Sequence, residues 1–213
     1  IRRRQRQMCI RDRFYTDLDR SHIEVREIAK MGRAAVDSNQ IFIDGLIVPE
    51  MHRIGEEGKG FSYLLDSLNP ERILIAAEAL GIGKTALRRA VEYAGQRIVF
   101  DRPIGQNQSI QHPLAENWVE LEAAGLLIAK AAHLYDSGAP AGGLANAAKY
   151  FAAEAGFKAA TQAVMTLGGI GYAKEYHVER LLRESLIPRL APVSAQMVLN
   201  YIAERVLGLP KSY

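Results

Sequence analysis

The sequence predicts a mainly α-helical fold, an antiparallel four/five-helix bundle preceded by a partial β-domain remnant. Three observations predict it. Apolar residues recur at helical spacing from about residue 60 onward, short loops with glycine separate these segments, and the preceding part has short β-rich runs beside turn residues. We therefore assign residues 14–57 to the tail of a β-domain and residues 58–213 to a helical bundle domain.

The first thirteen residues differ in composition from the rest, since they hold six arginines and the only cysteine. Residues 3–13 fit the codons of a transposase-type sequencing adapter in one reading frame. We interpret residues 1–13 as an adapter artefact, disordered and without function. The alternative is a natural basic arm for anions or targeting. On our interpretation, we expect the chain to be the C-terminal part of a longer protein.

Composition narrows the function classes. Without residues 1–13, Lys+Arg falls from 27 to 21 and Asp+Glu from 24 to 23, which leaves a net charge of −2 and removes the case for a nucleic-acid partner. No apolar stretch reaches the roughly 18 residues of a membrane span. The single cysteine allows no internal disulfide, so we expect a reducing compartment. The five histidines are scattered, so we expect no metal site.

Residues 14–57 read as strands and turns. The segment HIEVREI (22–28) alternates in part, and SNQIFIDGLIVPE (38–50) places Asp44-Gly45 between two apolar runs, which predicts a hairpin at that turn. So few strands cannot close a sheet alone. RIGEEGKGF (53–61) is interpreted as a glycine-rich linker.

Helical patterns follow in order. Asn69 is a suitable N-cap and Pro70 a suitable first residue, so the first long helix is expected from there to about Arg97. Its first half is apolar almost all round, which predicts deep burial. A second helix is expected at about 110–136, with Leu114, Trp118 and Leu121 inward. An alanine-rich third follows at about 144–167, and two more at about 175–186 and 193–207.

Several motifs allow two interpretations. GIGKT (81–85) lacks the first glycine of a phosphate-binding loop and lies inside a helix, so its glycines instead indicate close approach of a helix or ligand. Glu71 and Glu78 lie in apolar surroundings, where desolvation would raise the pKa of a general base; capping or an ion pair is the structural alternative. Gly168-Gly169 is either a helix C-cap or an anion site.

Taken in order, five blocks resemble one family. They are VPEMHRIGEEGKGF (48–61), NPERILIAAEALGIG (69–83), RIVFDRPIGQNQSIQHPLA (97–115), LGGIGYAKEYHVERLLRES (167–185) and a final helix with Gln196. This order resembles the C-terminal part of the acyl-CoA dehydrogenases, over about residues 20–207. The resemblance implies FAD-dependent α,β-dehydrogenation of an acyl-CoA thioester to a trans-2-enoyl-CoA, in which a carboxylate removes the α-proton and a hydride goes to flavin N5.

The resemblance also implies where the base lies. Many members carry it just before the last helix, where this chain has Pro192. A second pattern, similar to the isovaleryl- and long-chain-type members, places a Glu before an Arg on the first long helix. Glu71 followed by Arg72 matches that pattern, so Glu71 is the expected base and Arg72 is expected to orient the helix end or contact substrate.

The cofactor positions are implied in the same way. The residues expected to bind FAD are Arg97, Phe100, Gln108, Gly168, Gly169, Ser194 and Gln196. Some of these serve a neighbouring subunit in the family, which implies a homodimer or homotetramer. An electron-transfer flavoprotein is the implied electron acceptor, and the implied location is the cytoplasm of a bacterium or the mitochondrial matrix. The alternatives are an acyl-CoA oxidase-type flavoenzyme and a non-catalytic helical assembly module of the same fold.

Overall fold

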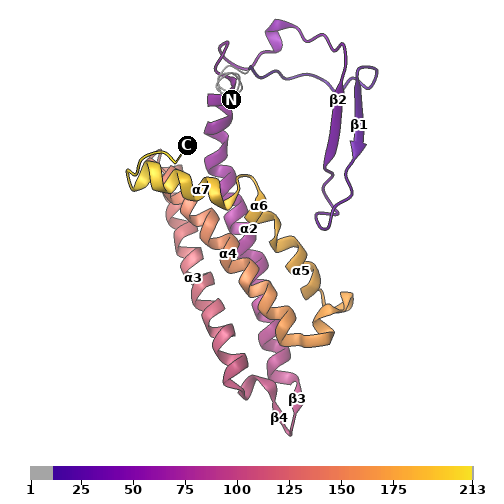
Figure 1. Cartoon of the computed structure of the whole chain (residues 1–213), viewed down its shortest axis with the longest axis vertical. Coiled ribbons are helices and arrows are strands. Elements are labelled where there is room, and N and C mark those ends of the chain that lie inside the picture. The colour runs from indigo at the N-terminus through magenta and orange to yellow at the C-terminus, as the bar shows by residue number, and fades with distance from the viewer. Residues whose placement is uncertain (1–11, 213) are drawn as a thin grey trace. The chain divides into compact units, whose positions relative to one another are not determined.

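The computed structural model describes residues 12–212. The chain divides into two compact units, one up to Leu68 and one from Asn69 onward, and the boundary falls within the first long helix (Figure 1). Because residues 1–11 lie outside the described residues, the interpretation of that segment as an adapter artefact stays a prediction.

The first unit contains a two-stranded antiparallel sheet. Strand β1 (Ile23–Glu27) pairs with β2 (Asn39–Ile43), so that Ile23 lies opposite Ile43. The predicted hairpin at Asp44-Gly45 is therefore wrong among the described residues, since the chain reverses between β1 and β2 instead. The Asp44 amide donates to the His22 carbonyl, which continues the pairing with β1 to the end of β2. A turn signal alone does not decide which strand becomes the partner.

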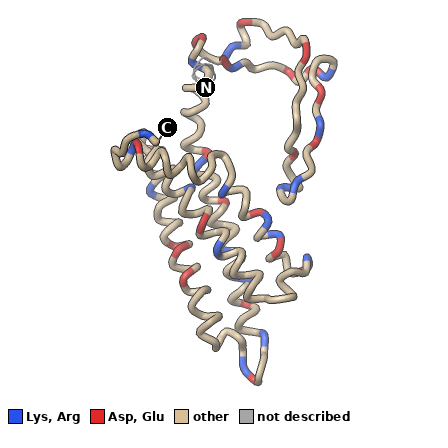
Figure 2. Tube along the Cα trace, in the orientation of Figure 1, with Lys and Arg blue, Asp and Glu red and all other residues tan. Residues whose placement is uncertain are grey.

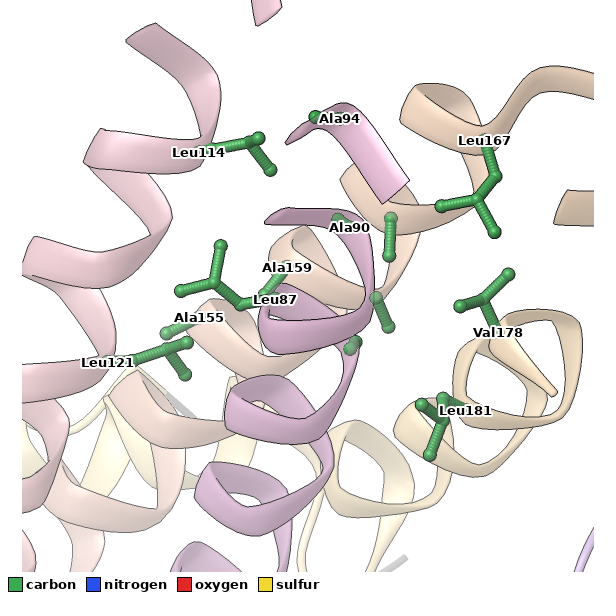
Figure 3. Packing of buried hydrophobic residues seen from close by; sticks show 13 residues of the cluster. Leu87, Ala90, Ala94, Leu114, Leu121, Ala155, Ala159, Leu167, Val178 and Leu181 are labelled. Atoms are coloured by element: carbon green, nitrogen blue, oxygen red, sulfur yellow. The ribbon is translucent and has the colours of Figure 1, made fainter. Parts of the chain in front are cut away.

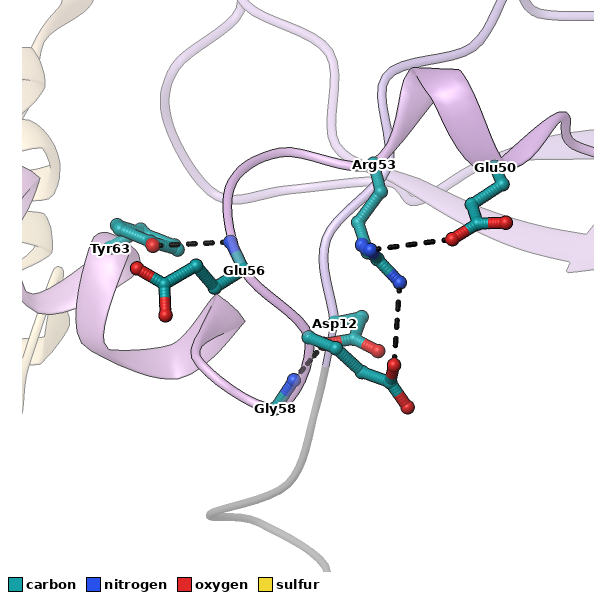
Figure 4. A network of polar contacts seen from close by, with 7 residues as sticks. Asp12, Glu50, Arg53, Glu56, Gly58 and Tyr63 are labelled. Atoms are coloured by element: carbon teal, nitrogen blue, oxygen red, sulfur yellow. Dashed lines mark hydrogen bonds and ion pairs between the residues drawn. The ribbon is translucent and has the colours of Figure 1, made fainter.

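Polar contacts join the end of this unit to its beginning (Figure 4). Arg53 forms ion pairs with Glu50, in the short 3₁₀ turn η1 (Glu50–His52), and with Glu57. The Gly58 amide donates to the Asp12 carboxylate, and the Ile54 amide donates to the Arg13 carbonyl. Asp12 and Arg13 are thus held by backbone hydrogen bonds, although both belong to the segment predicted to be an artefact.

The first long helix, α2 (Gly60–Gln96), begins nine residues before the predicted N-cap. Asn69 does not cap it, because its side-chain oxygen accepts a hydrogen bond from Arg72 Nη1 at 3.2 Å. Pro70 lies inside the helix, where it removes one backbone donor. The predicted start was therefore wrong, since cap-forming residue types were read without knowing their partners.

The second unit confirms the predicted helical bundle. Helix α3 (Gln108–Asp136) runs antiparallel to α2, and α4 (Gly142–Leu167) runs antiparallel to α3 and parallel to α2 (Figure 1). A two-residue hairpin, β3 (Ile98–Val99) and β4 (Arg102–Pro103), and the turn η2 (Ile104–Gln106) connect α2 to α3. After α4 come the turns and shorter helices η3 (Gly168–Tyr172), η4 (Lys174–Tyr176), α5 (Val178–Ser185), α6 (Ile187–Leu190) and α7 (Ala195–Tyr201), then a π-helical turn (Ile202–Val206).

The core of the bundle is built largely from alanines and a few leucines (Figure 3). Small side chains let the helices approach closely: a Cβ at Gly156 of α4 would lie 2.5 Å from the Ala79 carbonyl oxygen of α2. Gly83 is equally enclosed, since a Cβ there would lie 2.6 Å from Leu121 Cδ2. The prediction that the glycines of GIGKT allow close helix approach is confirmed for Gly83, whereas Gly81 has nothing within 4 Å.

Two burial predictions were wrong. The first half of α2 is not buried all round, because Leu74 remains 70% exposed while Ile73 and Ala76 are buried. Trp118 is 58% exposed, and the buried stripe of α3 instead carries Asn117 between Leu114 and Leu121. Along the helices of the second unit, Lys and Arg positions are interspersed with Asp and Glu positions (Figure 2).

Asn117 offers a stability test. Its side chain is fully buried, and neither amide atom has a hydrogen-bond partner among the described residues. Because a buried unpaired polar group costs about 1–3 kcal/mol, we expect Asn117→Leu to raise the free energy of unfolding by about 1–2 kcal/mol in urea titrations. The control is Asn146→Leu: Asn146 is also buried but donates to the Gly142 carbonyl at 2.8 Å, so its replacement should destabilise. Equal losses for both variants would contradict this expectation.

Candidate functional site

The structure separates the residues of interest into two groups at opposite ends of the bundle. Glu71 and Arg72 lie where α2 enters the second unit, near Tyr201 of α7, so Ser194 and Gln196 belong to the same end. The others lie around the β3–β4 hairpin and the end of α4, where Ala94, Leu114 and Leu167 pack into one cluster (Figures 1 and 3). At 1.5 Å per residue, α2 separates Arg72 from Arg97 by about 37 Å.

Glu71 heads an exposed face of α2. The residues that follow it on this face are Leu74, Ala77 and Gly81, and all of them are exposed within this chain. Glu78 lies two turns further and is half-buried. The apolar enclosure expected around Glu71 is thus not supplied by residues 12–212. What the chain presents is a carboxylate beside a strip of small and apolar side chains.

Arg72 is half-buried beside this carboxylate. Burial lowers the pKa of its guanidinium from the usual value, and the nearby Tyr201 and Glu71 act in the opposite direction. Its Nη1 donates to Asn69, but its Nε is buried and has no hydrogen-bond partner among the described residues. Arg72 therefore retains a donor that the described part of the chain does not use.

The segment before α7 carries the other two residues of this end. Ala191-Pro192 is a cis peptide, and the following Val193 carbonyl accepts a hydrogen bond from Lys149 Nζ at 2.6 Å. Ser194 is the N-cap of α7, and its side-chain oxygen accepts from the Met197 amide at 3.4 Å. Gln196 is exposed. Sequence reasoning missed Lys149, whose only signal was a lysine flanked by alanines in the first half of an alanine-rich helix.

At the other end, the β3–β4 turn presents an aromatic ring to solvent. Phe100 and Asp101 form the two-residue turn with φ angles of 51° and 60°, a region that non-glycine residues seldom adopt. Phe100 is 94% exposed. Arg97 and Gln108 flank the hairpin and are also exposed. A cavity of about 420 Å³ lies beside them, lined in part by Gly95, Pro103 and Gly105.

Gly168 and Gly169 end α4 at the same side of the bundle. Gly168 is the C-cap, with φ of 65°, so the C-cap interpretation is confirmed. A Cβ at either glycine would meet nothing within 4 Å, which leaves their backbone open to a ligand. Met165, one turn earlier, is 70% exposed.

Two kinds of feature are absent from residues 12–212. No group of three or more His, Cys, Asp or Glu side chains there could hold a metal ion. Among the same residues, no helix has both the length and the apolar character needed to cross a membrane.

Fold and site together define an α-helical bundle domain with exposed candidate residues at both ends. The family model for the acyl-CoA dehydrogenase C-terminal domain matches residues 58–207. The chain belongs to the acyl-CoA dehydrogenase family, as its sequence blocks indicated.

Individual relatives agree with this assignment. The acyl-CoA dehydrogenase fadE12 of Mycobacterium bovis is 46% identical over 176 residues, which cover 82% of this chain and 45% of that protein. An acyl-CoA dehydrogenase of Bacillus subtilis is 41% identical over 179 residues, which cover 84% of this chain and 47% of that protein. The solved structure of butyryl-CoA dehydrogenase from Megasphaera elsdenii matches this chain with a TM-score of 0.88 at 33% identity. The match covers 92% of this chain and 51% of that one. The chain spans about half the length of the curated relatives it matches.

Proposed function

We propose that this chain forms the helical domain of an FAD-dependent acyl-CoA dehydrogenase that converts an acyl-CoA thioester to a trans-2-enoyl-CoA. One observation carries the proposal: Glu71 lies at the head of an exposed strip of small and apolar residues on α2, at the end of the bundle where α7 begins. Family membership supports the reaction class, and this strip is the proposed binding surface for the acyl chain of the substrate.

In this proposal, Glu71 removes the proton from the α-carbon of the thioester. Leu74 and Ala77 continue along the helix from the carboxylate, so the acyl chain can lie against them. Gly81 leaves room at the far end of the strip. Arg72 lies beside Glu71 and donates to Asn69 one turn earlier on α2, which holds its guanidinium at this end of the bundle.

The second group of residues fits a cofactor that carries a diphosphate. Arg97 supplies positive charge, Gly168 and Gly169 leave their backbone open, and Phe100 offers a solvent-exposed ring for stacking. Gln108 adds an amide at the start of α3, while Ser194 and Gln196 would contribute from the opposite end. When bound, FAD supplies the acceptor for the hydride that leaves the β-carbon.

The distance between the two groups supports an oligomer. About 37 Å of helix separates them, whereas a compact small-molecule pocket of roughly 300–1,000 Å³ is only about 7–10 Å across. Both groups of one chain therefore cannot meet the same reacting atoms. We propose that each end serves a different cofactor copy in a homodimer or homotetramer, and that an electron-transfer flavoprotein reoxidises the enzyme.

The test uses the purified protein in its oxidised, yellow form. Under anaerobic conditions, mixing with a panel of acyl-CoA thioesters should bleach the oxidised-flavin absorbance and yield the matching enoyl-CoA. Absence of bound flavin, or unchanged absorbance with every thioester, would refute the proposal. Stoichiometric hydrogen peroxide in air would assign the protein to the oxidase type instead.

A further inference from the structure

Lys149 is the largest fully buried side chain among the described residues, with 1% of its surface exposed. It lies on α4, where its neighbours along the helix are mostly alanines. Burying an ammonium group is costly unless it is paired or hydrogen-bonded. The catalytic scheme above does not use this side chain. A buried lysine among alanines therefore needs another explanation.

Within residues 12–212, no carboxylate forms an ion pair with Lys149. Arg72 of α2 lies close enough to disfavour the ammonium form, while Glu154 on α4 favours it. The Glu154 carboxylate, however, is bound to Arg189 of α6 at 2.8 Å. On the α7 side, Tyr201 faces Arg72. Among the described residues, the ammonium donates to a single backbone carbonyl, that of Val193.

The Val193 carbonyl lies in the short connection between α6 and α7. Val193 follows the cis peptide Ala191-Pro192 and directly precedes Ser194, the N-cap of α7. The segment from 191 to 194 belongs to neither α6 nor α7, so helix hydrogen bonds alone do not hold it. The buried Lys149 ammonium of α4, 44 positions earlier in the sequence, donates a hydrogen bond to it.

We propose that Lys149 is a positioning residue that fixes the segment from Ala191 to Ser194, and thereby sets the placement of Ser194 and Gln196 at the Glu71 end of the bundle. Its effect on catalysis rests on the function proposed above, whereas its effect on the segment does not. An apolar side chain of the same length would fill the space equally well but would release the Val193 carbonyl. A substitution can therefore separate two effects of Lys149, namely filling its space in the core and binding the Val193 carbonyl.

The central experiment compares Lys149→Met and Lys149→Arg with wild type by amide hydrogen exchange. In Lys149→Met we expect the Met197 and Val198 amides, which are bonded to Ser194, to exchange at least about tenfold faster. Lys149→Arg keeps a donor and should restore most of the protection. The control is Lys158→Met, an exposed lysine of α4 paired with Glu116 and Glu120, which should leave these amides unchanged.

Two outcomes would overturn the proposal. One is unchanged protection at Met197 and Val198 in a folded Lys149→Met variant. The other, measured on wild type in case that variant does not fold, is rapid solvent exchange of the Lys149 ammonium hydrogens in nitrogen-15 NMR. In the flavin-loaded protein, Lys149→Met should slow anaerobic reduction by up to about 10²-fold, with recovery in Lys149→Arg. If wild type is not reduced at all, the function fails while the exchange result still stands.

The charge of Lys149 gives a second readout in the same variants. Burial, followed by the charge of Arg72, lowers the pKa of Lys149 below the usual 10.5. The unfolded chain therefore binds the proton more tightly, and the stability cost applies fully below the folded-state pKa and fades as pH rises toward 10.5. We expect the stability of wild type relative to Lys149→Met to increase over this range, with no such trend for Lys158→Met. A difference that does not vary with pH would contradict a charged Lys149.

Discussion

Replacing Glu71 with glutamine is expected to slow anaerobic flavin reduction by acyl-CoA by about 10²–10⁴-fold while FAD stays bound. Glutamine preserves the shape of the side chain but cannot accept the α-proton, and general-base catalysis contributes a factor of this size. The change is local, because Glu71 is exposed at the surface of α2 and makes no contact that the core depends on. The measurement is stopped-flow absorbance of the oxidised flavin in the intact, FAD-loaded protein.

The matched control for this prediction lies on the same helix. Glu78 is two turns from Glu71 and half-buried, so Glu78→Gln removes a second carboxylate from the same helix and leaves the proposed base in place. We expect it to retain the rate of reduction to within a few fold. If Glu78→Gln lost the activity and Glu71→Gln kept it, the base would have to be reassigned. Normal rates in both variants would show that neither carboxylate is the base.

A methyl group added at Gly156 is expected to destabilise the bundle by about 1–3 kcal/mol. The new Cβ would lie 2.5 Å from the Ala79 carbonyl oxygen, a backbone atom that can move only if α2 and α4 separate. Separation would loosen the alanine contacts on both sides of the crossing. This cost outweighs the roughly 1 kcal/mol that alanine gains over glycine in helix propensity. Thermal unfolding should show a midpoint lower by several degrees.

Gly81 provides the opposite case on α2. Nothing lies within 4 Å of a Cβ placed there, so Gly81→Ala should raise the free energy of unfolding by up to about 1 kcal/mol through helix propensity alone. Because Gly81 ends the strip proposed for the acyl chain, the same variant should discriminate against longer thioesters. A stabilised Gly156→Ala variant would show that the helices do not cross as closely as the structure describes.

Much of the helical domain could be predicted from residue order. The stripe from Ile73 to Ala94 repeats at helical spacing, and its members are buried or half-buried as expected. The ends of α3 and α4 also agree with prediction to within about two residues. These features depend on forces between neighbours in sequence, namely helix propensity and the pattern of apolar residues.

Predictions failed where the outcome depended on which other residues the fold brings into contact. Asp44-Gly45 has the residues of a hairpin turn, yet β2 pairs backward with β1 because those strands match in register. Asn69 has the residue type of a cap, yet it accepts from Arg72. Trp118 has the spacing of a core residue, yet the position with room inside is occupied by Asn117.

The sequence by itself determined the class of the domain, the order of its helices, and the residue blocks by which its family can be identified. Only the tertiary structure decided that the candidate residues divide between two ends of the bundle, and that Lys149 reaches the Val193 carbonyl. The physical reason is one of range. Periodicity and capping act over a few residues, whereas burial, hydrogen-bond partners and the space beside a glycine depend on which distant segments the fold brings together.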